Sequence, residues 1–212
     1  MYANITAKEL QSLMSLHIFS GTDKITPILS HLQITRSDDQ LTVLTTDRYC
    51  LARGVYPVDT IHDPEDGDGT VYLSLDTIKS FFPIVKKEPT NTMVTITDEQ
   101  ITVHGMTDTV IPVAQVTSTF PPVDRLIPDD VDARPEEPAG VVSLNPQFVA
   151  KLAKVLLPIA GKHDSSRPWR FTIGTEQNAM GNPKPAPVLC VPMHRDEQPN
   201  IVVMIQPNLL TR

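Results

Sequence analysis

The sequence has few of the residues and runs that mark a secreted, membrane-bound or disulfide-rich protein. Its two cysteines, Cys50 and Cys190, lie far apart in 212 residues with no CxxC spacing, so the sequence suggests neither a disulfide framework nor a cysteine metal motif. No apolar stretch has the length of a signal peptide or of a membrane span. We therefore expect a cytoplasmic protein with no membrane partner.

Positive charge is also scarce, because the formal net charge at pH 7 is -7. A protein that held nucleic acid over its whole surface would need the opposite sign, since phosphate attracts cations. Any contact with DNA is therefore expected to be local. A chain of this length with 40% hydrophobic residues can bury a substantial core in one or two domains.

No motif for catalysis, for a metal or for another cofactor stands out. The histidines show no ligand pairing: they are His17, His31, His62, His104, His163 and His194. The acidic run 62–69 has the oxygen density of a calcium loop but neither its spacing nor its terminal glutamate, so we interpret it as a solvated turn. Asp47, at a predicted strand end, is expected to cap a turn rather than to catalyse. The sequence predicts no enzymatic activity and no cofactor.

What the sequence does contain is a helix-opening pattern that occurs three times, roughly 70 residues apart. Each copy has a short apolar run, at 1–5, 71–75 and 141–144. Each run ends near a residue that can cap a helix: Thr6, Asp76 or Asn145. A one-sided apolar stripe follows, formed by Leu10, Leu13 and Met14, by Ile78, Phe81 and Phe82, and by Phe148, Val149, Leu152, Val155 and Leu156. A lone copy cannot bury its stripe, so the copies must share a sheet or stack.

Behind each predicted helix the apolar residues alternate, as they do in strands. The alternating segments are 28–34 and 41–58, then 93–97, 100–104 and 109–116, then 169–173, 188–191 and 201–205, with 177–187 interpreted as a loop. Each copy of the pattern is called a module below. We expect each module to form a strand, a helix and three antiparallel strands, which gives an α+β fold. We divide the chain into a domain of two modules over 1–127 (1–60 and 70–127), an acidic proline-rich linker over 128–140, and a third module over 141–212.

Three segments carry a family resemblance. They are LTVLTTDRYCLA at 41–52, FPPVDRLIP at 120–128 and IVVM at 201–204. In this order they resemble the A-T-D-x-x-x-L-A segment, the F-P-D-Y-R-x-V-I/L-P segment and the start of the final strand of bacterial DNA polymerase sliding clamps, the beta subunit family. The chain departs from the family in having three modules instead of six, so it resembles a shortened clamp, for which a phage source would be suitable. It also departs from the family's sequence at Arg48-Tyr49-Cys50 and at Met204–Pro207.

The resemblance implies a DNA clamp fold with antiparallel sheets outside and helices on the inner face. Such a protein encircles duplex DNA without sequence preference and holds a polymerase by topology, so weak phosphate contacts suffice. Lysines on the predicted helix faces would then face DNA: Lys8, Lys79, Lys86, Lys87, Lys151, Lys154 and Lys162. Ordinary solvated helix faces would carry the same residues.

The resemblance also implies an apolar groove for a short extended peptide of a polymerase, clamp loader or repair protein. The matching residues are Leu29, Thr46, Leu51, Pro121, Arg125, Leu126, Val202 and Met204. The alternative is that Leu29, Leu51 and Val202 belong to the core, and only their convergence in space would indicate a groove.

Assembly and function leave alternatives open at this point. Four copies of a three-module chain would supply a closed ring, yet an odd number of modules leaves one without its usual partner. The sequence therefore predicts a processivity factor and a possible homo-oligomer. It is also compatible with a monomeric adaptor or inhibitor that binds clamp partners without forming a ring, and with an open-surface, sequence-independent DNA-binding module.

Overall fold

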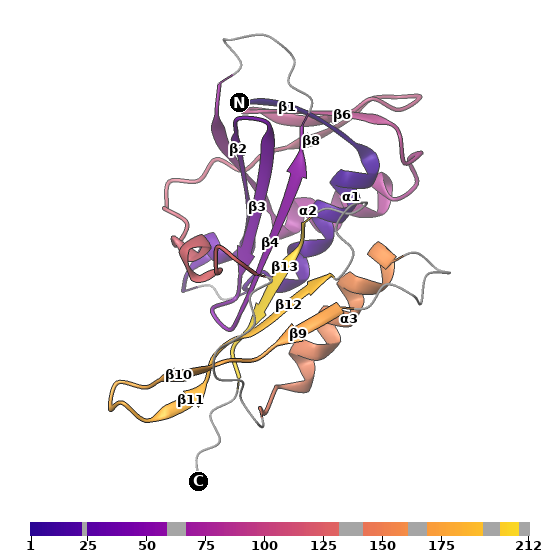
Figure 1. The fold of residues 1–212 in the computed structure, drawn as a ribbon. Helices are drawn as coiled ribbons and strands as arrows, with labels where there is room; N and C mark the ends of the chain where they lie inside the picture. Colours follow the sequence, from indigo (N-terminus) through magenta and orange to yellow (C-terminus); the bar gives the residue numbers. More distant parts are fainter. Residues whose placement is uncertain (23–24, 59–66, 132–141, 161–168, 193–199, 208–212) are drawn as a thin grey trace.

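The computed structural model describes residues 1–22, 25–58, 67–131, 142–160, 169–192 and 200–207, with only the backbone for 156–160. The ribbon in Figure 1 shows an α+β fold with antiparallel sheets, as predicted. Of the predicted residues, Val141, Lys162, His163 and His194 lie outside the described residues, as do the part of the acidic run at 62–66 and the linker residues 132–140. No helix in the described ranges has both the length and the apolar character needed to cross a membrane.

The three α-helices of the described chain begin where side chains accept bonds from free backbone amides. Helix α1 (Ala7–Ser15) opens with a capping box, in which Thr6 Oγ1 accepts from Glu9 N and the Glu9 carboxylate accepts from Thr6 N at 2.7 Å. Helix α3 (Pro146–Ala160) opens at Asn145, whose Oδ1 accepts from Gln147 N at 2.9 Å. Both caps agree with the sequence pattern.

Helix α2 (Leu75–Val85) corrects one prediction. The capping residue is Ser74, whose Oγ accepts a bond from Thr77 N at 3.1 Å, and Asp76 lies inside the first turn. Both residues are good caps, and the apolar Leu75 between them occupies the first helical position, buried at 7% exposure. The demand of Leu75 for burial therefore moves the helix start two residues earlier. Asp76 still favours the helix through its charge near the positive end of the helix dipole.

Two larger sheets and a small hairpin contain the strands of the described residues. The seven-stranded sheet runs β5 (Gly69–Ser74), β2 (His31–Ser37), β3 (Gln40–Thr46), β4 (Cys50–Pro57), β13 (Val202–Ile205), β12 (Val188–Pro192) and β9 (Trp169–Thr172). The four-stranded sheet runs β1 (Tyr2–Thr6), β6 (Met93–Thr97), β7 (Gln100–Val103) and β8 (Thr109–Pro112), and the hairpin pairs β10 (Thr175–Gln177) with β11 (Pro183–Pro185). Every strand pair is antiparallel.

Some predicted strands and loops differ from the structure at their ends. The predicted strand at 28–34 begins as a short 3-10 helix, η2 (Pro27–Ser30), because Pro27 fixes the backbone of its first residue. The predicted loop at 177–187 contains strand β11 and ends the β10–β11 hairpin, which the turn-forming residues between the strands close. Residues 142–145, preceding α3, form no strand.

The first two modules exchange their first strands. Strand β1 of the first module pairs with β6 of the second, and β5 of the second pairs with β2 of the first. Helix α1 packs against α2 between the two sheets, and Gln11 Nε2 donates to the carbonyl oxygen of Val85 at 3.0 Å. Neither module has a complete sheet without the other, so the two form one interlocked body.

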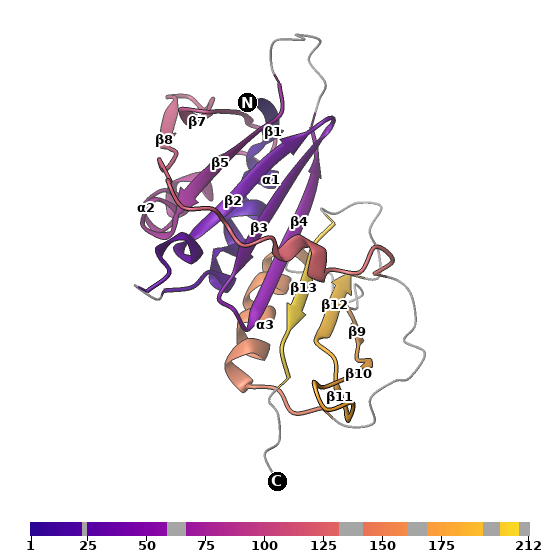
Figure 2. The same ribbon diagram turned by 90° about the vertical axis from the view of Figure 1, so that its left-hand side faces the viewer.

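The third module continues the sheet of the first. Strand β13 pairs with β4 over four residues, from Val202 opposite Arg53 to Ile205 opposite Cys50. Figure 2 shows the resulting sheet as one surface, with α1 and α3 behind it and a segment of the second module crossing in front. This segment, residues 114–131, is called the strap below. Across the seven-stranded sheet the order is therefore strap, sheet and helices.

Two apolar clusters fill the spaces between these layers. The inner cluster lies between sheets and helices and includes Leu10, Leu13, Ile78, Leu152 and Cys190. The outer cluster lies under the strap and consists of Ile28, Leu29, Leu44, Leu51, Phe120, Ile127, Val131, Leu189, Val191 and Val202. The seven-stranded sheet is thus covered on both faces.

Candidate interaction surfaces

The strap is held on the sheet by two arginines from strands of different modules. Arg53 of β4 donates through Nη1 to Asp124 Oδ1 at 3.1 Å, and Arg170 of β9 donates through Nη2 to the carbonyl oxygen of Val131 at 2.9 Å. Val131 is 6% exposed. The strap therefore fixes the second module to both the first and the third, and its last residue, Val131, is buried.

The structure brings four of the predicted groove residues together on the strap side of the sheet. Leu29, Leu51 and Val202 lie in the outer cluster, with Met204 packed against it, and Met204 lies directly opposite Leu51 in the β4–β13 pair. Leu29, Leu51 and Val202 are at most 5% exposed. They therefore form an apolar core beneath the strap, with Met204 half-buried beside it.

The remaining predicted groove residues divide between the turn and the strap. Thr46 is buried, and its Oγ1 donates to the carbonyl oxygen of Cys50 at 2.7 Å. Pro121 is half-buried, whereas Arg125 and Leu126 lie on the outside of the strap in η3 (Val123–Leu126), with Leu126 58% exposed. A partner could contact these last two residues without any change in the sheet below.

The turn between β3 and β4 is organised by Asp47, as the sequence predicted. Its Oδ1 accepts bonds from Tyr49 N at 3.0 Å and from Cys50 N at 2.7 Å. Between them Arg48 has a positive φ of 78°, a conformation that is uncommon outside glycine. The two accepted amides hold this turn in place, so Asp47 is a structural cap.

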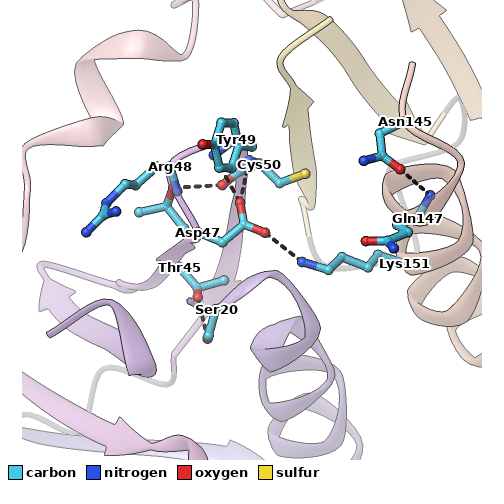
Figure 3. Close-up of polar contacts among 10 residues, drawn as sticks. Ser20, Thr45, Asp47, Arg48, Tyr49, Cys50, Asn145, Gln147 and Lys151 are labelled. Atoms are coloured by element: carbon cyan, nitrogen blue, oxygen red, sulfur yellow. Dashed lines mark hydrogen bonds and ion pairs between the residues drawn. The ribbon is translucent and has the colours of Figure 1, made fainter. Parts of the chain in front are cut away.

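The second carboxylate oxygen of Asp47 joins the turn to the third module, as Figure 3 shows. Lys151 of α3 donates through Nζ to Asp47 Oδ2 at 2.6 Å, and the two side chains are only 26% and 14% exposed. Tyr49 stacks on Phe148 with ring centroids 6.3 Å apart. Lys151, one of the lysines expected to face DNA, therefore has its charge paired inside a joint between two modules.

Four of the other predicted DNA-facing lysines lie exposed on or beside α1, α2 and α3. They are Lys8, Lys79, Lys87 and Lys154, and Lys86 is exposed too, with its Nζ 4.3 Å from the centre of the Phe82 ring. Carboxylates accompany the lysines of α1 and α2, namely Glu9 and Asp76. Five exposed lysines therefore lie on or beside the described helices, with carboxylates among them.

His17 lies among these lysines in the 3-10 helix η1 (Leu16–Phe19). Burial lowers its pKa below the ordinary value of 6.5, and the charges of Lys79 and Lys86 lower it further, against a bond to the carbonyl oxygen of Met14 that raises it. Its ring meets the edge of Phe82 with centroids 5.8 Å apart. His17 is therefore a neutral part of the contact between the first two modules near pH 7.

The reactivity of the two cysteines and the grouping of the possible metal ligands determine what chemistry the described ranges could support. Cys50 and Cys190 are free and buried, and burial raises the pKa of each to about 12. Thiols in such surroundings are poor nucleophiles. No group of three or more histidine, cysteine, aspartate or glutamate residues in these ranges could hold a metal ion.

The contacts at the joint had no signal in the sequence. Asp47 and Lys151 are 104 residues apart, and Arg53 and Asp124 are 71 residues apart. Each pair meets only because β13 aligns the third module beside β4 and the strap crosses both. The local pattern identified Asp47 as a cap, but it could not identify the partner of its second oxygen.

Comparison with solved structures identifies this architecture. The chain is similar to the DNA polymerase III beta subunit of Thermotoga maritima, with 13% identity and a TM-score of 0.58 over 99% of this chain and 66% of that one. It is similar to the DNA polymerase sliding clamp of Bacillus subtilis, with 13% identity and a TM-score of 0.59 over 99% of this chain and 64% of that one. A sliding clamp of Bartonella birtlesii gives 13% identity and a TM-score of 0.59 over 99% and 66%.

These similarities concern structure rather than sequence. No protein-family model matches the sequence, and no curated protein matches it. The chain spans about two thirds of the length of the solved clamps, between 64% and 66% in these three cases. Over nearly all of its own length, the chain has the fold of the bacterial DNA polymerase III beta sliding clamps in a shortened form.

Proposed function

We propose that this protein is a sliding-clamp-like processivity factor that contacts or encircles duplex DNA and docks replication proteins. The observation that supports the proposal is the layered architecture. The helices lie on one face of a sheet that continues from module to module, and the similarity to sliding clamps covers 99% of the chain. Helices on one face and docking residues on the other allow DNA and protein partners to bind at the same time.

The charge distribution is compatible with a clamp that holds DNA weakly. Retention by topology needs few phosphate contacts, and weak contacts permit sliding. We assign these contacts to the exposed lysines of the helix side, Lys8, Lys79, Lys86, Lys87 and Lys154, and leave Lys151 out because it is paired with Asp47. The acidic net charge of -7 would then reside mainly elsewhere on the surface.

Protein docking is assigned to the strap side of the sheet. Leu126 and Arg125 are exposed on the strap, and Met204 is half-buried beside the outer cluster. An apolar anchor beside an arginine suits an extended peptide with a leucine or aromatic side chain and a hydrogen-bond acceptor. Leu29, Leu51 and Val202 would support this surface from below.

Retention on circular DNA tests the proposed function. The full chain is incubated with nicked circular plasmid and passed through a gel-filtration column before and after the plasmid is cut once. Encirclement predicts that protein co-elutes with the circle and is lost after cutting. Equal retention on linear DNA with a steep salt dependence would indicate an open binding surface instead, and no retention in either form would contradict DNA binding.

Docking is tested separately with a fluorescent peptide that carries the leucine and aromatic anchors of a clamp-binding polymerase. Leu126→Gln and Met204→Gln should each weaken binding, because each removes an accessible apolar contact. Val110→Gln, at a 47% exposed position of β8 in the other sheet, is the matched control and should bind normally. Binding of the peptide without any DNA retention would favour an adaptor that binds clamp partners without a ring. Leu51→Gln is a poor probe, since Leu51 is 5% exposed and its loss would disturb the core.

A further inference from the structure

Within the described residues, the third module has no strand equivalent to β5, the strand that completes the sheet beside the first module. In the first module, β2 is flanked by β3 on one side and by β5 of the second module on the other. In the third module, β9 takes the place of β2 and pairs with β12, while the described residues place no strand on its other side. Among the described strands, β9 is therefore the last of the seven-stranded sheet, and its outer edge is a template for pairing with another chain.

Side chains near this edge show the same incompleteness. Phe171 lies opposite Cys190 and so faces the helix side of the sheet, yet it is 51% exposed. At the corresponding edge of the first module, Ile34 lies opposite Val43 and is 0% exposed. On α3, Val149 is 47% exposed. An exposed apolar side chain on the inward face of a sheet, together with an exposed valine on the helix of the same module, is typical of a surface that another body covers.

The segment that would supply the matching strand precedes α3 but is not paired. In the first two modules the strand before the helix pairs with the other module, and its inward residues Ile5 and Leu73 are at most 5% exposed. In the third module, residues 142–145 have the same alternation before the helix cap, with Val142 and Leu144 at the equivalent positions. These residues form no strand, and Val142 and Leu144 are only partly buried.

We propose that two copies of this chain associate through their third modules. Each copy donates residues 142–145 to the open edge of the partner's β9, and each α3 packs beside the partner's α3. The first two modules provide the template, since they exchange β1 and β5 in this way and pack α1 against α2. A second copy is the occupant that the structure favours because it carries both required parts, an alternating strand and a capped helix, in the same order.

The charges of the two surfaces permit such a twofold contact. Residues 142–145 are Val-Ser-Leu-Asn and carry no charge. The one charged residue of β9, Arg170, pairs across to Val191 of the outer cluster, so it points to the strap side, where it donates to Val131. Edge strands that avoid pairing carry lysine, proline or a bulge. β9 has neither lysine nor proline, so pairing of residues 142–145 with this strand brings no like charges together across the strand pair.

The solution mass of the full chain tests the proposal. Light scattering across a concentration series should give an even multiple of 23.4 kDa at high concentration. Phe171→Glu should halve the mass and raise the dissociation constant at least about 100-fold, because an unpaired carboxylate would be buried at the contact. Met180→Glu introduces the same charge at an 86% exposed position of the β10–β11 turn and should leave the mass unchanged. A persistent monomer, or a Phe171→Glu variant with the mass of the original chain, would overturn the proposal.

Folding of the variants has to be checked independently. Phe171 is already half exposed, so Phe171→Glu should keep the far-UV circular dichroism of the original chain. If that variant does not fold, Val149→Glu on α3 serves the same purpose, because its side chain is 47% exposed. Either folded variant is sufficient to decide between a contact at this edge and a contact elsewhere.

Cross-linking locates the contact. Chains with Ser143→Cys and chains with Thr172→Cys are mixed and treated with a short bis-maleimide at pH 7. Both positions alternate with inward residues, so they would lie on one face of the new strand pair. The native thiols Cys50 and Cys190 would not compete, since both are buried. The mixture should give a cross-linked dimer and each variant alone should not; equal cross-linking in all three samples would exclude the proposed exchange. The proposal is independent of DNA binding and stands or falls without it.

Discussion

The first two modules and the third module solve the same structural problem to different extents. The first two share two sheets by exchanging β1 and β5, and their central strand residues Leu32 and Ile34 are 0% exposed. The third module is attached to them through β13 and the Asp47–Lys151 pair, but its outer strand β9 keeps an exposed Phe171. In the interlocked pair, each strand–helix–three-strand module is half of a folding unit that the other module completes.

The largest expected effect comes from removing apolar contacts in the two regions. Ile34→Ala in the interlocked modules should cost about 2–5 kcal/mol of unfolding free energy, because it leaves a cavity in a closed core. Phe171→Ala should cost less than about 1 kcal/mol at concentrations where the chain is monomeric, since half of that side chain is already in water. Urea unfolding of both variants measures the difference. Equal costs would show that the edge of β9 is as well packed as that of β2.

A smaller effect is expected at the joint between the regions. Asp47→Ala should cost about 2 kcal/mol, since it removes the acceptor of two backbone amides and leaves Lys151 unpaired. Asp47→Asn keeps an acceptor for the amides and should cost about half as much. Hydrogen exchange should show faster exchange in α3 in both variants. Unchanged exchange in α3 would mean that the β4–β13 pairing alone holds the third module.

The strap contact is expected to contribute less. Arg53→Met should cost about 0.5 kcal/mol, because its partner Asp124 is about half exposed and water screens the pair. Limited proteolysis should cut the strap of the variant faster than that of the original chain. Asp124→Asn, which keeps an acceptor, is the matched control. If the strap of Arg53→Met is cut no faster than that of the control, Phe120 and Ile127 hold the strap instead.

Acid should weaken the interlocked modules through His17, with the smallest effect of the four. The folded pKa of His17 lies below its ordinary value of 6.5, so between these two values the unfolded chain binds a proton that the folded chain does not. The contribution of neutral His17 to the free energy of unfolding is therefore fully present above pH 6.5 and falls as the pH drops from 6.5 to the folded pKa. His17→Gln should flatten this part of the pH profile of the urea midpoint, with the midpoint at pH 8 as the reference. An unchanged slope would assign the acid sensitivity to other groups.

The sequence was sufficient for the elements and the fold class, because both depend on local patterns. The helical stripes, the capping residues Thr6 and Asn145 and most alternating segments correspond to observed elements. The cap of α2 was wrong because Ser74 and Asp76 are both good acceptors, and only the burial of Leu75 decides between them. The family resemblance of three short segments predicted a clamp fold, and the solved clamps have the same fold as this chain.

The pairing between modules could not be predicted, because it depends on distant residues. Alternation shows that a strand has one apolar face, but it does not say that β1 pairs with β6 or that β13 pairs with β4. The same limit applies to the candidate site. An alternating Leu51 fits a groove wall and a buried core equally well, and the strap that buries it arrives from another module. Lys151 looked like a free helix lysine until Asp47 was brought beside it.

The pairing of β4 with β13 has a mechanical consequence. Four residues of ladder, together with the Asp47–Lys151 pair and the stacked Tyr49 and Phe148, connect the third module to the first by many bonds that must break together. The first and third modules should therefore move as one rigid body rather than bend at the boundary between them. Any assembly of such chains would open and close where separate copies meet, and the strength of that contact would set how long the assembly stays closed.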